Sequence, residues 1–468
     1  MQLWVRLRGL LLFSCLSLNI TTTRATVLEP GYNLQTFFNG SATPASLAFG
    51  PDSTLYVGQL DSTVIAIRDL NHDGIADTSI TFAAGMLNPT GLAFHQGRLF
   101  VSFSKQINAY TDTNGDYIAD VVDSILTMPP TAGRNYGIAI GPDNLLYVGA
   151  AGTDNLGPQG HPWAGTILRC TTQGNSIEVF ASGVRVAYGL AFNSNGELFV
   201  TDNGPSPEST MCFEAPDELN WIQQGANYGF PNCFGFGDCA DVSSVCNPPP
   251  CGVGDCDFGG CDSTVAYPIS LFDPHSSADG MAFGDSFEGF GPGDLFVAEF
   301  GQTVPAGGCN SDFGHQVSRV SVYEQNGQWF ADPPIPFVTD LGRPLDVAVG
   351  PDHALYIADF ETGDVLRVAK DETVSVPENR PNPHPFKLWP NPARQFTQVL
   401  WETPAPKNFV AAVFDAKGRV ITSLNSQTNG MMRWDLKDTS SKRVAAGVYF
   451  LRITDEQGTH SRKIQVLP

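Results

Sequence analysis

The sequence has few basic residues and, beyond its N-terminus, no long apolar run. After residue 25 no apolar stretch approaches the ~18 residues that a membrane helix requires, so we expect a chain that does not span a membrane. The chain has 26 Lys and Arg against 48 Asp and Glu. Three basic residues precede position 26 and 12 follow position 385, which leaves about 11 basic against about 42 acidic residues between them. This strongly acidic region repels nucleic acid and anionic lipid, which excludes both as partners.

The motif for covalent haem attachment, Cys-x-x-Cys-His, is also absent. Apart from Cys15 the chain has nine cysteines, and the four from Cys246 to Cys261 recur every five residues. This spacing differs from the Cys-x-x-Cys pairs of most structural zinc sites. In an exported chain we therefore expect the nine cysteines to form disulfides, with one left over.

Residues 1–25 have the features of a secretory signal peptide. Arg6 and Arg8 precede an apolar run from Gly9 to Leu18, and polar residues follow up to Ala25. The residues before Cys15 resemble a lipoprotein cleavage box, but their apolar run is short. We therefore predict ordinary cleavage.

Glycine and proline are abundant, at 48 and 34 residues, and only 16% of residues are charged, which favours short strands and turns. One phrase recurs six times: an apolar strand, a turn rich in Gly, Pro, Asp or Asn, and then Leu-aromatic-Val or Ile. The leucine of the second strand falls at positions 55, 99, 146, 198, 295 and 355. A repeat near 45 residues built of short strands is typical of a propeller. We predict an all-β, six-bladed β-propeller over residues 26–372.

Two intervals exceed this repeat, and we expect insertions after blades four and five. In a propeller such insertions build a site on one face, above the central channel. The loop that follows Asp202 is rich in carboxylates, amides and aromatic residues, and oxygen donors of these kinds bind calcium. The predicted calcium ligands are Gly204, Pro205, Asp217, Glu218 and Tyr228. The alternative is an acidic loop that is simply solvated.

Two further acidic loops repeat a D-x-N-x-D spacing with a fourth Asp further on. They carry Asp69, Asn71, Asp73 and Asp77, and then Asp112, Asn114, Asp116 and Asp120. This spacing wraps calcium as the first half of an EF-hand loop does, although the glutamate of the twelfth position and the helical pattern are missing. We predict structural calcium in both loops.

The periodicity stops near residue 373. Proline concentrates in residues 373–385, which predicts a linker. Residues 386–468 show alternating strands with turns at Lys417-Gly418 and Gln457-Gly458, which predicts a small, seven-stranded, Ig-like β-sandwich.

The motifs of this tail resemble the C-terminal sorting domain of the type IX (Por) secretion system. They are Trp389 to Pro392, Asp415 to Arg419, Ala446 to Leu451 and Lys463 to Val466. The resemblance implies the type IX secretion machinery as a partner, passage through the periplasm, and release or surface attachment of the protein.

The propeller resembles the glucose/sorbosone dehydrogenase family, six-bladed quinoproteins that use pyrroloquinoline quinone (PQQ) and calcium. The match is densest in residues 181–204, 216–231 and 343–359. It implies that main-chain oxygens of Gly204 and Pro205 bind the cofactor's calcium and that Arg185 contacts the cofactor. Few cations are available for a tricarboxylate. The candidates are Arg185, Arg319, Arg343 and Arg134, of which we predict Arg185 and Arg343 as cofactor-binding.

The sequence departs from the family at the catalytic base. The family's histidine falls on Gly133, the asparagine after the blade-four arginine is Val186, and the basic cluster of blade five has no counterpart. Either His275, His161 or His315 supplies the base from another loop, or the pocket no longer performs this oxidation. We predict His275, because its phrase occurs in sorbosone dehydrogenase-like members.

This resemblance implies a secreted aldose- or sorbosone-type dehydrogenase. A base takes the proton of a sugar hydroxyl while hydride passes to the quinone, and an unidentified external acceptor receives the electrons. One alternative is a non-catalytic, calcium-stabilised propeller that binds carbohydrate or protein. Another is a calcium-dependent, lactonase-like hydrolase, since calcium and carboxylates also activate water.

Overall fold

The computed structural model describes residues 25–205, 215–235, 238–239, 264–301 and 313–371 of the N-terminal unit. In the C-terminal unit it describes residues 386–389, 391, 393–401, 409–415, 419–424, 432–445, 447–455 and 458–466. The predicted linker, Cys212, Cys309, the four cysteines from Cys246 to Cys261 and nearly all of the predicted signal peptide lie outside these residues.

The first three blades are sheets of four strands each, taken in chain order. Blade 1 contains β3 (Pro44–Phe49), β4 (Leu55–Gln59), β5 (Thr63–Arg68) and β6 (Thr78–Ala84). Blade 2 contains β7 (Pro89–His95), β8 (Arg98–Phe103), β9 (Gln106–Thr111) and β10 (Val121–Thr127). Blade 3 contains β11 (Asn135–Ile140), β12 (Leu145–Ala150), β13 (Thr166–Thr171) and β14 (Glu178–Ser182).

The other three blades include the inserted residues. Blade 4 contains β15 (Ala187–Phe192), β16 (Leu198–Asp202), β17 (Pro216–Ile222) and β20 (Ser270–Pro274). Blade 5 contains β21 (Ala278–Phe283), β22 (Asp294–Glu299), β23 (Gln316–Gln325) and β25 (Ile335–Thr339), with β24 (Gln328–Ala331) and β1 (Thr26–Val27) paired at its outer side. Blade 6 contains β26 (Pro344–Val349), β27 (Leu355–Asp359), β28 (Asp364–Lys370) and β2 (Tyr32–Asn39). The insertions thus lie within blades 4 and 5. The prediction that they follow these blades was wrong, because the strands that complete each blade come after the inserted residues.

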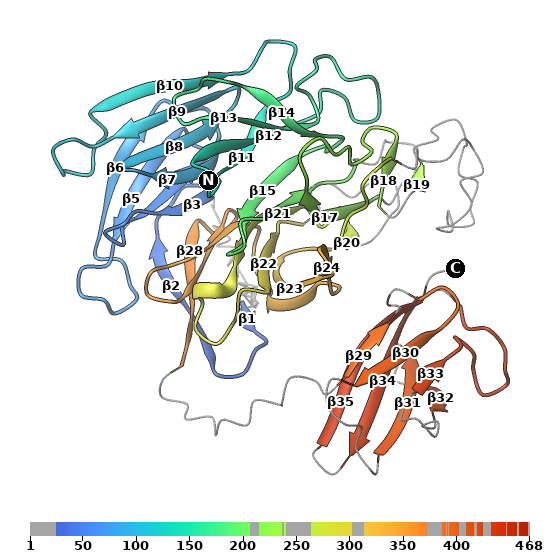
Figure 1. The fold of residues 1–468 in the computed structure, drawn as a ribbon. Coiled ribbons are helices and arrows are strands. Elements are labelled where there is room, and N and C mark those ends of the chain that lie inside the picture. Colours follow the sequence, from blue (N-terminus) through green and yellow to red (C-terminus); the bar gives the residue numbers. More distant parts are fainter. Residues whose placement is uncertain are drawn as a thin grey trace, which may run out of the picture.

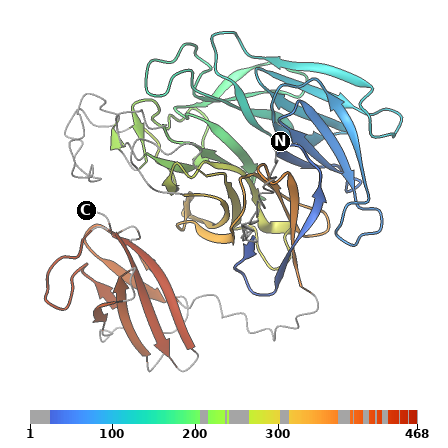
Figure 2. The same cartoon turned by 180° about the vertical axis from the view of Figure 1, so that it is seen from behind.

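The six sheets follow one another around a ring in chain order (Figures 1 and 2). Their inner strands contact in the cyclic order β3, β7, β11, β15, β21, β26 and again β3. The ring closes because β2, from the N-terminal side, pairs antiparallel with β28 of the last blade. The predicted six-bladed, all-β propeller is confirmed. The only helical element in the described residues is the short 3-10 turn η1 (Gly284–Ser286), and none of these residues forms a helix long and apolar enough to cross a membrane.

The recurring phrase of the sequence forms the inner hairpin of a blade. In blade 3 the turn between β11 and β12 contains Asp143, whose carboxylate accepts the hydroxyl of Tyr147 at 2.9 Å, and Asn144, which has a φ of 60°. Blade 6 repeats the contact, with the hydroxyl of Tyr356 donating to Asp352 at 2.9 Å. The turn residue and the strand residue that it binds are therefore encoded together in these two repeats.

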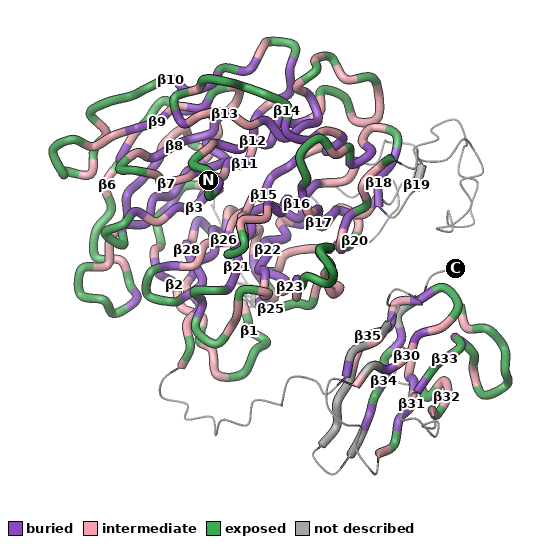
Figure 3. The backbone as a smooth tube through the Cα atoms, in the orientation of Figure 1, coloured by how far each residue is buried: buried purple, intermediate pink, exposed green. Residues whose placement is uncertain are grey.

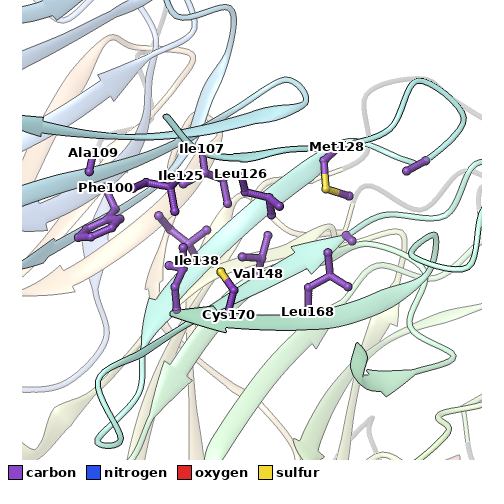
Figure 4. Close-up of a cluster of buried hydrophobic side chains, with 13 residues drawn as sticks. Phe100, Ile107, Ala109, Ile125, Leu126, Met128, Ile138, Val148, Leu168 and Cys170 are labelled. Carbon is purple, nitrogen blue, oxygen red and sulfur yellow. The ribbon is translucent and has the colours of Figure 1, made fainter. Parts of the chain in front are cut away.

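Apolar side chains fill the space between neighbouring blades. Phe100 and Ile107 of blade 2 point toward Ile138, Val148 and Cys170 of blade 3 (Figure 4). Buried segments follow the strands, whereas most exposed segments are loops (Figure 3). Each such side chain contributes about 1.5–3 kcal/mol to the stability of the blade stack. Cys170 is buried and free, whereas Cys233 is disulfide-bonded.

The C-terminal unit contains two sheets that share one core. One sheet consists of β29 (Phe386–Trp389), β30 (Thr397–Trp401) and β33 (Met432–Trp434). The other consists of β32 (Val420–Leu424), β31 (Phe409–Asp415), β34 (Gly447–Asp455) and β35 (Gly458–Val466). Phe386 and Trp434 of the first sheet pack with Val413 and Ile464 of the second. The described residues of this unit thus form seven strands in a β-sandwich, as the sequence predicts. The two short strands β18 (Cys233–Phe234) and β19 (Asp238–Cys239) belong to the inserted residues of blade 4.

Candidate active site at the mouth of the channel

Within each blade, the inner strand begins at the face of the propeller where the second strand ends. The connections that follow the second strand are long in blades 3, 4 and 5, where they span residues 151–165, 203–215 and 300–315. The described ends of these connections therefore lie on one face of the propeller, at one end of the central channel, which we call the mouth. Most of the predicted cofactor-binding residues lie here.

Arg185 precedes the inner strand of blade 4, and its main chain is held by a buried carboxylate. Both oxygens of Asp202 accept the N–H of Arg185 at 2.9 Å, and one of them also accepts the N–H of Val186 at 2.6 Å. Burial raises the pKa of Asp202 to about 6, although these hydrogen bonds oppose the shift. Asp202 thus fixes the position of the Arg185 main chain at the mouth.

The guanidinium of Arg185 binds main-chain oxygens of the loop that follows β16. Its Nη1 donates to the carbonyl oxygens of Asn203 at 3.2 Å and of Gly204 at 2.9 Å, and its Nη2 donates to Asn155 Oδ1 at 2.9 Å. Burial lowers the pKa of Arg185, and the charge of Asp202 opposes this shift. Two carbonyl oxygens therefore converge on one cationic nitrogen above a buried carboxylate.

The predicted acidic ligands of this loop are buried beneath the mouth. Asp217 accepts the N–H of Gly204 at 2.8 Å and of Ala278 at 3.1 Å, and burial raises its pKa. Glu218 accepts the N–H of Gly235 at 2.5 Å, and burial raises its pKa to about 8. Their carboxylates hold neighbouring loops together. Over the part of the chain that the structure describes, no group of three or more His, Cys, Asp or Glu side chains is arranged to hold a metal.

Tyr228 is not brought to Gly204. Its hydroxyl donates to the carbonyl oxygen of Trp221 at 2.6 Å and accepts the N–H of Gln223 at 2.9 Å, at the far end of β17 from Asp217. The carbonyl oxygen of Gly204, another predicted ligand, instead accepts a hydrogen bond from the guanidinium of Arg185 at 2.9 Å. Pro205, the next predicted ligand, is buried beside Gly204.

Aromatic rings and two more arginines complete the mouth. The guanidinium of Arg134 lies 5.7 Å from the ring centre of Tyr136, which lies 5.5 Å from that of Tyr188. On the other side Arg343 lies 5.1 Å from the ring of Phe300, which lies 5.7 Å from that of Phe360. These four rings belong to one apolar cluster that links blades 3 to 6. A planar polyanion fits this combination of aromatic faces and guanidinium groups.

Arg343 is positioned as Arg185 is. Asp359 accepts its N–H at 2.8 Å, and the side chain of Arg343 reaches Glu361 at 3.2 Å. Arg319, the other candidate, pairs with Asp294 at 2.8 Å, at the opposite end of β22 from the mouth. The structure thus places Arg134, Arg185 and Arg343 at the same end of the channel, each just before the inner strand of its blade, and leaves Arg319 out.

The position of the family's histidine is closed to any side chain. A Cβ on Gly133 would lie 1.8 Å from the carbonyl oxygen of Ala151. His275, in contrast, lies half-buried between β20 and β21. It is next to Ser276, whose hydroxyl donates to Asp217, the residue that holds Gly204. His315 is hydrogen-bonded through Nδ1 to the carbonyl oxygen of Gly342.

The two D-x-N-x-D loops join the third and fourth strands of blades 1 and 2, at the face opposite the mouth. Asp69 accepts the N–H groups of His72 at 2.7 Å and Gly74 at 2.8 Å. Asp112 accepts those of Gly115 at 2.7 Å and Tyr117 at 2.8 Å.

The rest of each loop repeats the same pattern. The fourth aspartates, Asp77 and Asp120, both accept main-chain N–H groups, of Leu70 at 2.6 Å and Thr113 at 2.8 Å. In between, Asn71 and Asn114 each accept the N–H of the aspartate two residues on, Asp73 and Asp116, at 2.9 Å. The two loops share one conformation, and calcium in them stays a prediction.

The fold and this mouth define a six-bladed propeller with a cationic, aromatic site on its axis. Residues 56–227 match the family model described as a domain of unknown function (DUF7133), and residues 387–467 match the secretion system C-terminal sorting domain. A sequence relative is quinoprotein glucose dehydrogenase B of Acinetobacter calcoaceticus, 28% identical over 166 residues. That match covers 28% of this chain and only 33% of the relative.

Solved propellers have the same fold. The Trichoderma reesei carbohydrate-active enzyme of family AA12 matches with a TM-score of 0.62 at 18% identity, over 75% of this chain and 99% of its own. The PQQ domain of Coprinopsis cinerea pyranose dehydrogenase matches with a TM-score of 0.61 at 14% identity, over 74% and 97%. The PQQ-bound aldose sugar dehydrogenase of Streptomyces coelicolor matches with a TM-score of 0.52 at 20% identity, over 74% and 98%. The predicted resemblance to quinoprotein sugar dehydrogenases and to the type IX sorting domain is thus confirmed.

Proposed function

We propose that the protein is an exported, quinoprotein-type sugar dehydrogenase that binds PQQ and calcium at the mouth of its propeller. The observation that carries this proposal is the grouping of Arg134, Arg185 and Arg343 around aromatic rings. The body of the chain has only about 11 basic residues, so three at one channel end are a concentrated anion-binding feature. The partial sequence homology and the shared fold support the same function.

The chain's own residues have distinct roles in this proposal. Arg185 and Arg343 bind carboxylates of the cofactor, and Arg134 stacks beside them on Tyr136. The main-chain oxygens at Gly204 and Pro205 would hold the calcium, which would take the place of the Arg185 guanidinium at Gly204 when that guanidinium binds the cofactor. Asp202 and Asp217 would provide a negative environment for the ion. When bound, the quinone would accept hydride and calcium would polarise its carbonyl.

His275 is the proposed general base. Its loop adjoins Gly204 through Asp217, so its imidazole is near the proposed calcium, and it accepts the proton of the sugar hydroxyl. His315 is less suited, because its Nδ1 already binds Gly342. The sugar's electrons leave through an external acceptor.

A second function is favoured by one observation, the closed position at Gly133. If no other histidine replaces the family's base, the propeller binds a carbohydrate or protein without oxidising it. The two functions differ in whether quinone binding leads to sugar-dependent electron transfer.

The test is a titration of the full chain with PQQ in calcium buffer, followed by absorbance and by dye reduction with a panel of aldoses. We expect saturable binding that weakens at least tenfold in Arg185→Ala. Arg319→Ala is the matched control, because the guanidinium of this arginine is also hydrogen-bonded within the propeller but lies away from the mouth. Absence of binding at tens of micromolar quinone would overturn the dehydrogenase.

We also propose that the C-terminal unit directs the protein through the type IX secretion machinery to the cell surface or the medium. The sorting-domain match over residues 387–467 supports this route. Calcium in loops 69–77 and 112–120 would brace the propeller after export.

A further inference from the structure

A second feature of the same face is a hollow of about 470 Å³ beside the mouth. It lies between the 151–165 loop of blade 3 and the segment that follows β17, and its lining includes His161, Ser182, Asn227 and Phe230. Its volume is within the range of ~300–1,000 Å³ that is usual for small-molecule sites. Apart from His161, an alternative candidate for the catalytic base, these residues have no role in the functions considered above.

The described residues that line the hollow include no Asp, Glu, Lys or Arg. In a chain with a net charge of −22 such a neutral hollow suits an uncharged ligand. Its polar side chains carry two hydroxyls, two carboxamides and an imidazole, which can both donate and accept hydrogen bonds. They belong to Thr166, Ser182, Gln159, Asn227 and His161. Phe230 adds an aromatic surface. This mixture fits the hydroxyls and the C–H face of a sugar ring.

The polar groups are oriented by the chain around them. His161 Nδ1 accepts the N–H of Trp163 at 3.1 Å, which leaves the proton of the neutral ring on Nε2. Asn227 Oδ1 accepts the N–H of Gly229 at 3.1 Å, so its exposed amide group keeps its donors for a ligand.

Glycines make room for this arrangement. A Cβ on Gly183 would lie 2.1 Å from Asn227 Oδ1, and a Cβ on Gly152 would lie 2.8 Å from the ring of Phe230. Gly183 also has a φ of 76°, which side chains rarely adopt. The backbone is therefore shaped so that Asn227 and Phe230 lie directly against it.

The hollow adjoins the mouth. Gly183, which lines it, is two residues from Arg185, and the same blade 3 loop contacts both places. At one end Asn155 Oδ1 accepts Arg185 Nη2 at 2.9 Å, and at the other Gly165 accepts the N–H of Gly183 at 2.9 Å. A ligand that occupies both places must be longer than one ring.

We propose that this hollow is a saccharide subsite that binds a neutral unit of an oligosaccharide whose terminal unit reaches the mouth at Arg185. The identity of the reacting unit rests on the proposed dehydrogenase function, whereas the subsite itself does not. Sugar binding measured without quinone therefore tests the subsite independently of the dehydrogenase function.

The test is calorimetric titration of the full chain, without PQQ, with α-1,4- and β-1,4-linked glucose series of one to four units. We expect the affinity for one series to rise about tenfold or more with length. Asn227→Ala should weaken binding of the longer sugars about five- to tenfold, the loss of one or two hydrogen bonds. Asn195→Ala, an exposed asparagine in the β15–β16 turn, is the control and should bind as the unaltered chain does.

His161→Ala provides a second variant on a different segment, with circular dichroism to verify folding. Affinity that is independent of sugar length in both series, or that neither variant weakens, overturns the subsite. Length-dependent binding without any quinone binding supports the subsite while overturning the dehydrogenase. Dye reduction with a monosaccharide, together with length-independent binding, supports the dehydrogenase and overturns the subsite.

Discussion

Both carboxylate oxygens of Asp202 accept the main-chain N–H of Arg185 at 2.9 Å, and Asp359 holds the main chain of Arg343 at 2.8 Å. Each aspartate ends the second strand of its blade, and each arginine precedes the inner strand of the same blade. The same hydrogen bond, from the main chain of an arginine to the aspartate that ends the second strand, thus occurs in two blades and places a guanidinium at the mouth in each. It couples the stability of the blade to the position of the arginine.

Asp202→Asn tests this coupling. One acceptor oxygen becomes an amide group that faces main-chain donors, so we expect a loss of about 1–3 kcal/mol in the free energy of unfolding. We also expect weaker quinone binding, since Arg185 loses its fixed position. Urea unfolding and quinone titration measure the two effects. Asp285→Asn, an exposed control, should change neither, and equal behaviour of both variants would contradict the coupling.

Gly133→Ala should destabilise the protein by about 3 kcal/mol or more, because the new Cβ would lie 1.8 Å from the carbonyl oxygen of Ala151. Gly291→Ala is the matched control, since the nearest atom to its Cβ would be 4.0 Å away. Thermal unfolding compares the two. A Gly133 variant as stable as the control would mean that a histidine can be accommodated there after all.

His275→Gln should lower kcat for sugar oxidation about 10²- to 10⁴-fold if His275 is the base, with quinone affinity unchanged. His353→Gln is matched in backbone conformation, with a φ of 61° against 60° for His275, and should retain full activity. Dye reduction measures the rate and absorbance titration the affinity. Unaltered kcat in the His275 variant would move the search for the base to His161 or His315.

Calcium removal should lower the melting temperature, and Asp69→Asn and Asp112→Asn should each remove part of the calcium response. A site at 100-fold its Kd contributes about 2.7 kcal/mol. Because the loops belong to different blades, the double variant should show the sum of both losses. Melting curves in calcium and in chelator give the response. Asp285→Asn is the control. If Asp69→Asn and Asp112→Asn showed the same change in melting temperature with calcium as this control, metal would be excluded from these loops.

Glu299→Gln should reduce the dependence of stability on pH. Burial raises the pKa of Glu299 from 4.5 to about 7, opposed by hydrogen bonds from Ser318 and Gln316. Between these values the folded state keeps a proton that the unfolded state releases, so the free energy of unfolding falls as pH rises. The fall is on the order of 3 kcal/mol between pH 5 and 8 at most.

Urea unfolding in chelator at both pH values measures this dependence. Glu324→Gln, on the exposed part of β23, serves as control and should keep the full pH slope. An equally steep slope in the Glu299 variant would show that other groups cause it.

Part of the site was predictable because it lies on one continuous stretch. Arg185 and Gly204 are 19 residues apart, and the structure joins them in one hydrogen bond. Tyr228 was misjudged as a ligand beside Gly204, because sequence proximity does not reveal that its hydroxyl binds the main chain at the far end of β17. Arg134 was named only as a possible partner, and the rings of Phe300 and Phe360 were missed, because nothing local links them.

The sequence by itself determined the number of blades and the nature of the tail, because each blade's inner hairpin is encoded locally, as the contact between Asp143 and Tyr147 illustrates. Only the tertiary structure decided which residues meet at the mouth. Ring closure by β2 and β28 brings together blades that are far apart in the chain, so that Arg134 and Arg343 reach the same channel end. It also decided that Gly133 is closed, because the obstructing oxygen of Ala151 lies just past the end of β12, 18 residues further along the chain.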